Sequence, residues 1–196
     1  MSNRSKVLRT LLVLGIVACI AGAGVFSAFS SQTDNPGNVV TAGTVVLADN
    51  DGGTALYAMT AAKPGESTTS CVKVSYTGSL PATVKILTPS TIGELGTSVN
   101  LKIEAGTQTT STFPSCTAFT PDSGGPLFEG TLAAFAAEHN SFATGVTDFP
   151  GTSATKWVSN DSVVYRITAT LSAAAPESAQ GKTTGTHILR WEAQNQ

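Results

Sequence analysis

Residues 68–76 read TTSCVKVSY, and this stretch decides the fold class because polar and apolar side chains alternate along it. Val72, Val74 and Tyr76 share one parity, and Lys73 lies on the other with its polar neighbours. A period of two places successive side chains on opposite faces of a β-sheet. We therefore predict a half-buried β-strand here, with the valines and the tyrosine facing the core.

Similar apolar stretches recur along the rest of the chain, and turn signals such as Asn50-Asp51-Gly52-Gly53 and Pro64-Gly65 separate them. We expect further strands at residues 39–49, 55–59, 82–87, 99–103, 162–171 and 184–193. Many short strands with glycine and proline between them are typical of a two-sheet fold. The sequence therefore predicts an all-β protein with a jelly-roll-like β-sandwich.

One helix interrupts this pattern, at residues 131–140. Leu132, Phe135 and Ala136 fall on one face of it, and Glu138 and His139 are expected to face water. The linker 172–181 is expected to include at most a helical turn.

The first 27 residues have the three parts of a secretory signal peptide. Three basic residues come first, and an uncharged run over residues 10–29 follows. Val25 and Ser27 then place a β-branched and a small side chain at positions −3 and −1 of a cleavage site. We therefore predict cleavage between Ser27 and Ala28.

Two other fates of this region are possible on sequence grounds. The uncharged run is long enough to cross a bilayer as a retained anchor, and residues 16–19 pass as a loose lipobox that would make Cys19 a lipidated N-terminus. With cleavage, the chain divides into a signal peptide (1–27), a flexible segment (28–38) and a β-sandwich domain (39–196). Its contact with the membrane is then limited to the signal segment.

Composition favours export and argues against nucleic acid as a partner. Residues 1–27 contain three basic and no acidic residues, so the net charge changes from −2 for the whole chain to −5 for residues 28–196. An acidic chain without a basic patch lacks the charge that phosphate backbones require. Residues 28–196 include 28 threonines, and threonine suits the exposed face of a sheet.

Cys71 and Cys116 are the cysteines that remain after cleavage at residue 27. An even pair in a secreted domain predicts a disulfide bond. Two buried free thiols, or two ligands of a metal site, are the alternatives.

Several blocks of this chain resemble the TasA/camelysin family. Residues 24–30 (GVFSAFS) and 38–47 (NVVTAGTVVL) are similar to the family's export signal, which a SipW-type signal peptidase cuts before an Ala-Phe pair. Five later blocks are similar in the same order, at residues 63–67, 78–82, 127–132, 180–183 and 190–194. The resemblance implies a secreted protein that forms extracellular fibres or, as in camelysin-type members, a metallopeptidase.

Residues 122–126 read DSGGP and are similar to the nucleophile loop of trypsin-like serine proteases. In that family the catalytic histidine precedes the serine, whereas His139 and His187 both follow Ser123. Pro121 also replaces the glycine before the aspartate. We interpret the motif as a Gly-Pro turn between two strands.

Metal-dependent hydrolysis also lacks a motif. Zinc catalysis usually takes three protein ligands, often from an H-E-x-x-H helix, and the chain contains no such motif. Glu138 and His139 form one adjacent pair, and His187 lies 48 residues further on. We therefore predict no catalytic residue, no metal site and no cofactor.

These observations predict a secreted structural protein of the cell surface or biofilm matrix. Residues 28–38, once freed by cleavage, could add as a strand to the sheet edge of a neighbouring copy, and repeated addition would produce filaments. A camelysin-like surface metalloprotease and a monomeric cell-surface binding module are the alternatives.

Overall fold

The computed structural model describes residues 41–151 and 154–195, and the fold is that of the compact unit Ala42–Gln196. The predicted signal peptide, its cleavage site and the segment 28–38 lie outside the described residues. The strands are β1 (Leu47–Asp49), β2 (Ser67–Tyr76), β3 (Thr83–Leu87), β4 (Val99–Gln108), β5 (Phe119–Pro121), β6 (Phe128–Thr131), β7 (Val146–Asp148), β8 (Ser162–Leu171) and β9 (Arg190–Gln194).

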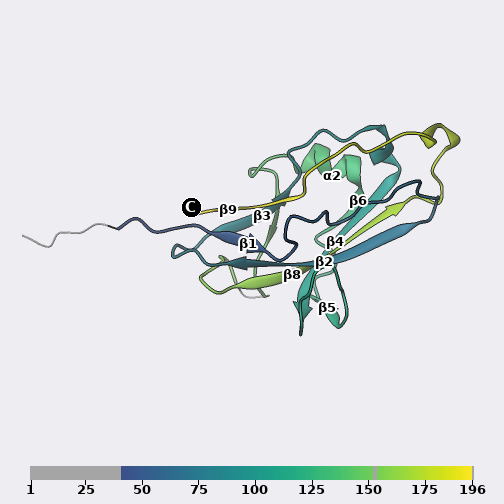
Figure 1. Ribbon diagram of the computed structural model, residues 1–196. Coiled ribbons are helices and arrows are strands. Elements are labelled where there is room, and N and C mark those ends of the chain that lie inside the picture. Colours follow the sequence, from purple (N-terminus) through teal and green to yellow (C-terminus); the bar gives the residue numbers. More distant parts are fainter. Residues whose placement is uncertain (1–40, 152–153, 196) are drawn as a thin grey trace, which may run out of the picture. The chain divides into compact units, whose positions relative to one another are not determined.

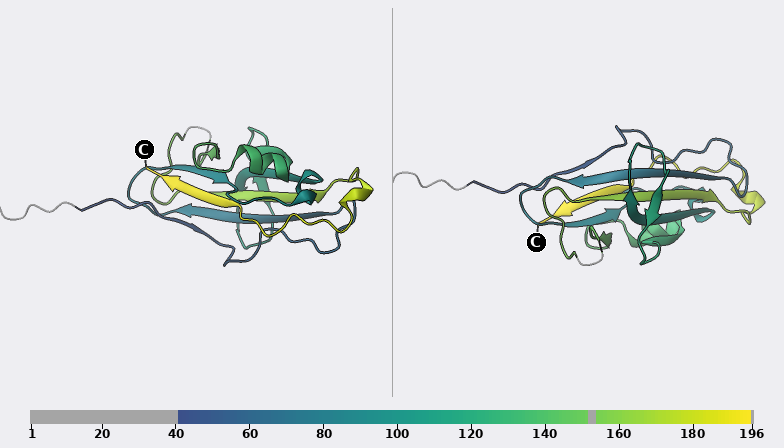
Figure 2. Two further views of the ribbon diagram at one scale, coloured as in Figure 1. Left: turned by 90° about the horizontal axis from the view of Figure 1, so that it is seen from above. Right: turned by 90° about the horizontal axis from the view of Figure 1, so that it is seen from below.

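Two antiparallel sheets pack against each other, which confirms the predicted β-sandwich (Figure 1). The larger sheet has the order β1-β2-β8-β4-β5, and β6 also pairs with β4. The smaller sheet has the order β7-β3-β9. In the larger sheet β8 lies between β2 and β4, so strands far apart in the sequence are neighbours, as Greek-key connections require. Figure 2 shows β9, in yellow, running beside β3 from two further directions.

The core fills the space between the sheets. The alternation predicted for residues 68–76 is confirmed, because Val72, Val74 and Tyr76 are each at most 1% exposed. The register places Val72 opposite Tyr165 of β8, and Tyr165 opposite Ala105 of β4. All of these side chains belong to one buried cluster, which removes their apolar surface from water.

The predicted helix is present but shorter, as α2 (Leu132–Glu138). Thr131 caps it, because its side chain accepts a hydrogen bond from the amide of Ala134 at 3.1 Å. Leu132 and Phe135 are fully buried, as expected. Two short 3-10 helices, η1 (Glu94–Thr97) and η2 (Glu177–Ala179), complete the elements, and η2 confirms the helical turn expected within residues 172–181. None of the described helices is long and apolar enough to span a bilayer.

Three expected strands are wrong in whole or in part. Of residues 41–49, the described part of the first expected strand, only Leu47–Asp49 form a strand; residues 55–59 form none, and the strand expected at 184–193 begins only at Arg190. Leu56, Tyr57 and Met59 of the first stretch and Leu189 of the second pack against the core, although residues 55–59 and 184–189 lie in no ladder of backbone hydrogen bonds. In these two stretches, the β-forming residues therefore indicated burial and not strand pairing.

Candidate docking groove

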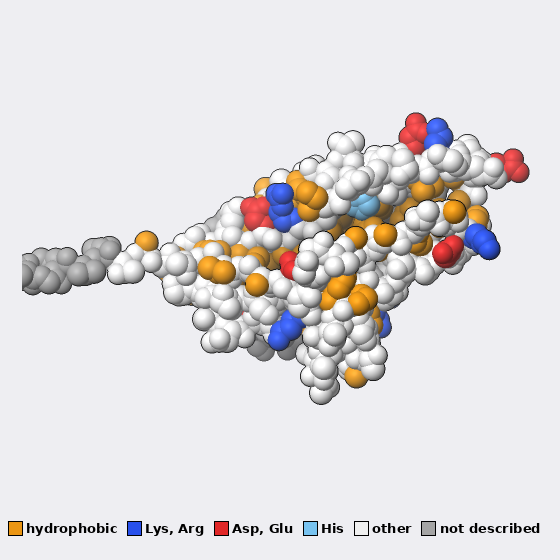
Figure 3. Space-filling model, in the orientation of Figure 1, with side chains coloured by type: hydrophobic (Ala, Val, Ile, Leu, Met, Phe, Trp, Pro, Cys, Tyr) orange, Lys and Arg blue, Asp and Glu red, His pale blue; other side chains and the backbone are white. Residues whose placement is uncertain are grey.

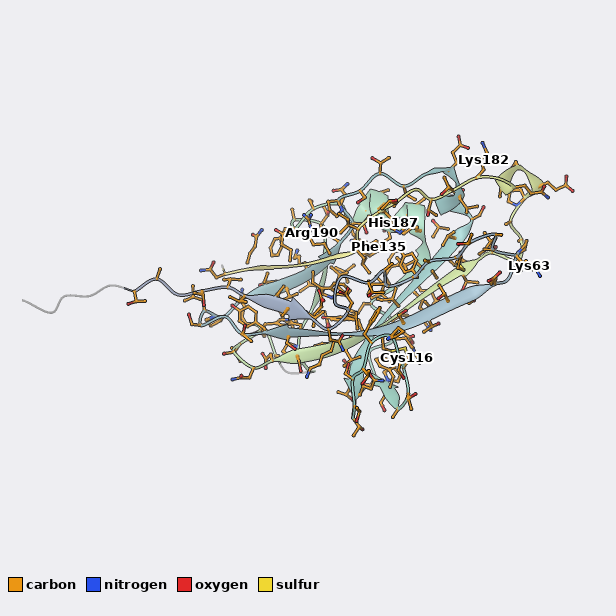
Figure 4. All side chains as sticks on the ribbon, viewed as in Figure 1. Lys63, Cys116, Phe135, Lys182, His187 and Arg190 are labelled. Atoms are coloured by element: carbon orange, nitrogen blue, oxygen red, sulfur yellow. A yellow bond between two sulfur atoms is a disulfide. The ribbon has the colours of Figure 1, made fainter. Side chains whose placement is uncertain are left out.

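A groove opens beside the smaller sheet, where irregular segments replace its strands. Residues 54–62 form one wall and residues 183–189 form the other, and the cavity between them measures about 740 Å³. Its floor consists of apolar residues from the larger sheet and α2: Val99, Leu132, Ala169 and Leu171. Figure 3 shows hydrophobic side chains gathered in this groove beside a histidine, which Figure 4 labels as His187. A volume of this size is within the range of ligand and peptide pockets.

The first wall, 54–62, leaves the sheet through a tight turn. Gly52 and Gly53 both have positive φ, at 63° and 79°, a conformation that glycine adopts without steric cost. The amide of Gly53 donates to the side chain of Asp51 at 2.7 Å and closes the turn. Beyond it, the hydroxyl of Ser70 on β2 donates to the carbonyl of Leu56, which ties the wall to the larger sheet.

The second wall, 183–189, is tied to the chain that follows β3. The amide of Gly93 donates to the carbonyl of Thr184 at 2.7 Å, and the amide of Ile188 donates to the hydroxyl of Ser90 at 3.1 Å. Ile188 is nevertheless 52% exposed, an unusual position for a large aliphatic side chain. The rim of the groove therefore offers apolar surface to solvent.

Tyr57 and His187 face each other across the groove. The Tyr57 hydroxyl and Nε2 of His187 are 2.6 Å apart, and Nδ1 of His187 is 3.0 Å from the carbonyl of Gly185. Because a carbonyl can only accept, Nδ1 carries the proton, and Nε2 then accepts from the Tyr57 hydroxyl. Burial raises the pKa of Tyr57 well above its usual value, so this hydroxyl remains a donor.

The predicted disulfide between Cys71 and Cys116 is confirmed, with the two Cα atoms 5.0 Å apart. Cys71 belongs to the outer parity of β2, and the bond holds the segment before β5 over the outer face of the larger sheet. Figure 4 shows Cys116 on the side of this sheet away from His187. A disulfide of this kind is typical of an oxidising location, either extracellular or periplasmic.

The two histidines lie in different surroundings from those expected. His139 was expected to face water, but its ring packs at 5.0 Å from that of Phe135 and at 5.8 Å from that of Phe128. Its Nδ1 lies 2.7 Å from the carbonyl of Thr144. His187 was expected in a strand, and it lies instead in the irregular wall of the groove.

Residues 122–126 form the loop between β5 and β6, with Gly125 at a φ of +82°, so the DSGGP motif occupies a turn as interpreted. The hydrogen bonds of both histidine rings lead elsewhere than to this loop. Over residues 41–151 and 154–195, no three or more His, Cys, Asp and Glu side chains gather where they could hold a metal ion.

The groove itself is absent from the sequence-based expectations. Its signal in the sequence was limited to the apolar residues of 55–59 and 188–189, where strands were expected. No protein-family model matches this chain. No curated protein matches it either. The resemblance to the TasA/camelysin family thus depends on the sequence blocks alone.

Proposed function

We propose that this chain is a secreted structural protein of the cell surface or biofilm matrix, and that its copies assemble head to tail into fibres. The observation that carries the proposal is an open sheet edge that continues into an apolar groove. In this proposal, an extended segment of one copy, freed by a SipW-type signal peptidase, occupies the edge and groove of the next copy. The family resemblance supports the same assignment.

The open edge belongs to β9. This strand pairs with β3 on one side and is the last strand of the smaller sheet, so over residues 190–193 no second strand pairs with it within the described residues. The wall 183–189 leads directly into β9 and is bonded on one side to residues 90–95. In the described chain, no backbone hydrogen bond joins this wall to residues 54–62.

A strand added from another copy would contact both the edge of β9 and the groove. Its backbone could bond to the edge of β9, and alternate side chains could enter the groove above Leu171 and Val99. Such a contact joins two different surfaces, so each copy keeps a free edge for the next one. Residues 28–38 are the segment in this proposal, and every copy carries them.

Electron microscopy and sedimentation of the purified exported chain test the proposal. We expect filaments, and particle mass that rises with protein concentration. Deletion of residues 28–38 should leave a folded protein that stays small, because these residues make contacts between copies. A parent chain that remains monomeric at high concentration would instead favour the cell-surface binding module.

A matched pair of surface variants localises the contact. Ile188→Asp places a charge on the rim of the groove and should abolish assembly. Val158→Asp is the control, because Val158 is exposed to a similar extent, 48% against 52%, and does not line the groove. Equal loss of assembly in both variants would show that the groove is not the acceptor. Metal-dependent proteolysis by the parent would favour the surface metalloprotease.

A further inference from the structure

The hydrogen bond between Tyr57 and His187 links two segments that are 130 residues apart in the sequence. Tyr57 belongs to the wall 54–62, and His187 belongs to the wall 183–189. Within residues 41–151 and 154–195, this is the one hydrogen bond that joins the two walls. The width of the groove between them therefore depends on this contact together with apolar packing.

Each wall is anchored independently on its own far side. The carbonyl of Leu56 accepts from Ser70 of β2, while the carbonyl of Thr184 accepts from Gly93. Separation of the walls would leave the anchor to β2 in place, whereas the bonds that the amides of Gly93 and Ile188 make between the second wall and residues 90–93 would lose the support of Tyr57. The two walls can thus part by loss of the Tyr57–His187 bond without disturbance of either sheet.

The geometry of the bond also suits reversible opening. The Nδ1 proton of His187 is held by the carbonyl of Gly185, so the ring keeps its orientation and tautomer when Tyr57 leaves. The ring centroids lie 5.5 Å apart at an angle of 44°, and both residues line the cavity together with its apolar floor. No other titratable side chain bonds to either ring, and Asp51 is the one acidic residue among those that line the cavity of the described chain.

We propose that the Tyr57–His187 bond is a latch that holds the groove narrow, and that it must open before an extended segment can enter. The identity of that segment, a second copy of this chain, rests on the proposed function. The latch itself is a property of a single molecule. Its two side chains therefore control access to the groove, and the residues of the floor supply the binding surface.

Amide hydrogen exchange on the exported chain, at a concentration where sedimentation shows monomers, tests the latch. Tyr57→Phe removes only the hydroxyl. Because one neutral hydrogen bond changes an opening equilibrium by about two- to tenfold, the amides of Gly93, Leu95 and Ile188 should exchange faster by that factor. Tyr76→Phe is the control, since it removes a buried hydroxyl that bonds the carbonyl of Leu80 away from the groove.

A double-mutant cycle separates the latch from a general loss of stability. His187→Leu should speed exchange at the same three amides, and the double variant with Tyr57→Phe should be no faster than either single variant. Unchanged exchange in Tyr57→Phe, or multiplied effects in the double variant, would overturn the latch whether or not the protein assembles. Faster exchange in a chain that never assembles would confirm the latch and overturn only the acceptor role of the groove.

Discussion

Tyr165 of β8 donates its hydroxyl proton to Oδ2 of Asp148 on β7, and this 2.8 Å hydrogen bond joins the two sheets through the core. Tyr165 is fully buried and Asp148 is 9% exposed. The register places Asp148 beside Val84 of β3, on the inward-facing row of the smaller sheet. The indole of Trp157 also donates to the backbone carbonyl of Asp148, at 2.8 Å. Tyr165 thus satisfies the carboxyl group and Trp157 the backbone carbonyl, and burial of either group without a partner would be costly.

Tyr165→Phe should destabilise the fold by about 1–3 kcal/mol, because it leaves the buried carboxyl of Asp148 without its side-chain donor. Urea denaturation at neutral pH measures the change. Tyr57→Phe is the comparison. Tyr57 lies at the partly exposed rim of the groove, so removal of its hydroxyl should lower the free energy of unfolding by less. Equal stability of Tyr165→Phe and the parent would show that the bond between the sheets contributes nothing.

The stability of the fold should depend on the protonation of Asp148. Burial, the dominant cause, raises the pKa of Asp148 above its usual value of 3.8, although the bond from Tyr165 opposes the shift. The folded state thus holds this proton more tightly than the unfolded state does. The resulting stabilisation is complete below the usual pKa and is lost as the pH rises through the folded pKa.

Asp148→Asn provides the test. The stability of the parent relative to that of Asp148→Asn should decrease as the pH is raised from about 3 to 7, measured by denaturation at each pH. A difference that stays constant or increases over this range would contradict the raised pKa.

Glu104 should have the opposite pH dependence. Its hydrogen bond from Arg166, at 2.8 Å, is the main cause that lowers the pKa of Glu104 below its usual value of 4.5, and Lys102 at 3.2 Å adds to it. The stabilisation is present above the usual pKa and is lost as the pH falls through the folded pKa. Glu104→Gln should therefore lose stability relative to the parent at pH 7 and match it in strong acid. A similar loss of stability at all pH values would show that packing of the Glu104 side chain, and not its charge, stabilises the fold.

Removal of the disulfide should lower the stability of the fold more than any of the other substitutions. Replacement of both Cys71 and Cys116 by alanine opens a loop of 45 residues and should cost about 4 kcal/mol, or roughly 10 °C in Tm. Calorimetry of the double variant measures the change, and non-reducing peptide mapping of the parent should recover the linked pair. Free thiols in fresh, unreduced parent protein would argue against an oxidising location.

Processing should release a chain that begins at Ala28. Val25 and Ser27 supply the side chains that a signal peptidase accepts at positions −3 and −1, and all three residues lie outside the described residues. Intact-mass measurement and N-terminal sequencing of secreted protein decide the point. A lipid-modified Cys19 at the N-terminus, or a membrane-held chain that still begins at Met1, would contradict this prediction.

The long strands β2 and β8 of the larger sheet were predictable because their burial follows a local rule, whereas the short strands β5, β6 and β7 were not expected. Residues 68–76 and 162–171 each have one inward and one outward parity, and both form strands almost at the expected bounds. The helix at Leu132 was predictable for the same reason, since its apolar spacing and its threonine cap are local. The pairing of Cys71 with Cys116 followed from the even number of cysteines that remain after the predicted cleavage.

The groove was not predictable, because strands were expected at the apolar residues of 55–59 and 188–189. Whether an apolar stretch pairs or merely covers the core depends on the neighbours that reach its backbone, and those neighbours come from distant parts of the chain. The partners of Asp148 are equally non-local, since Tyr165 follows it by 17 residues and lies on the other sheet.

The sequence by itself thus determined the β-sandwich class, the buried faces of the long strands, the helix and the disulfide, because each depends on residue periodicity or on residue number. Only the tertiary structure decided that Tyr57 meets His187, that Asp148 is buried against Tyr165, and that β9 is the last strand of the smaller sheet in the described chain. The physical reason is that hydrogen bonds between distant segments depend on how the sheets are stacked, and no local pattern specifies that arrangement.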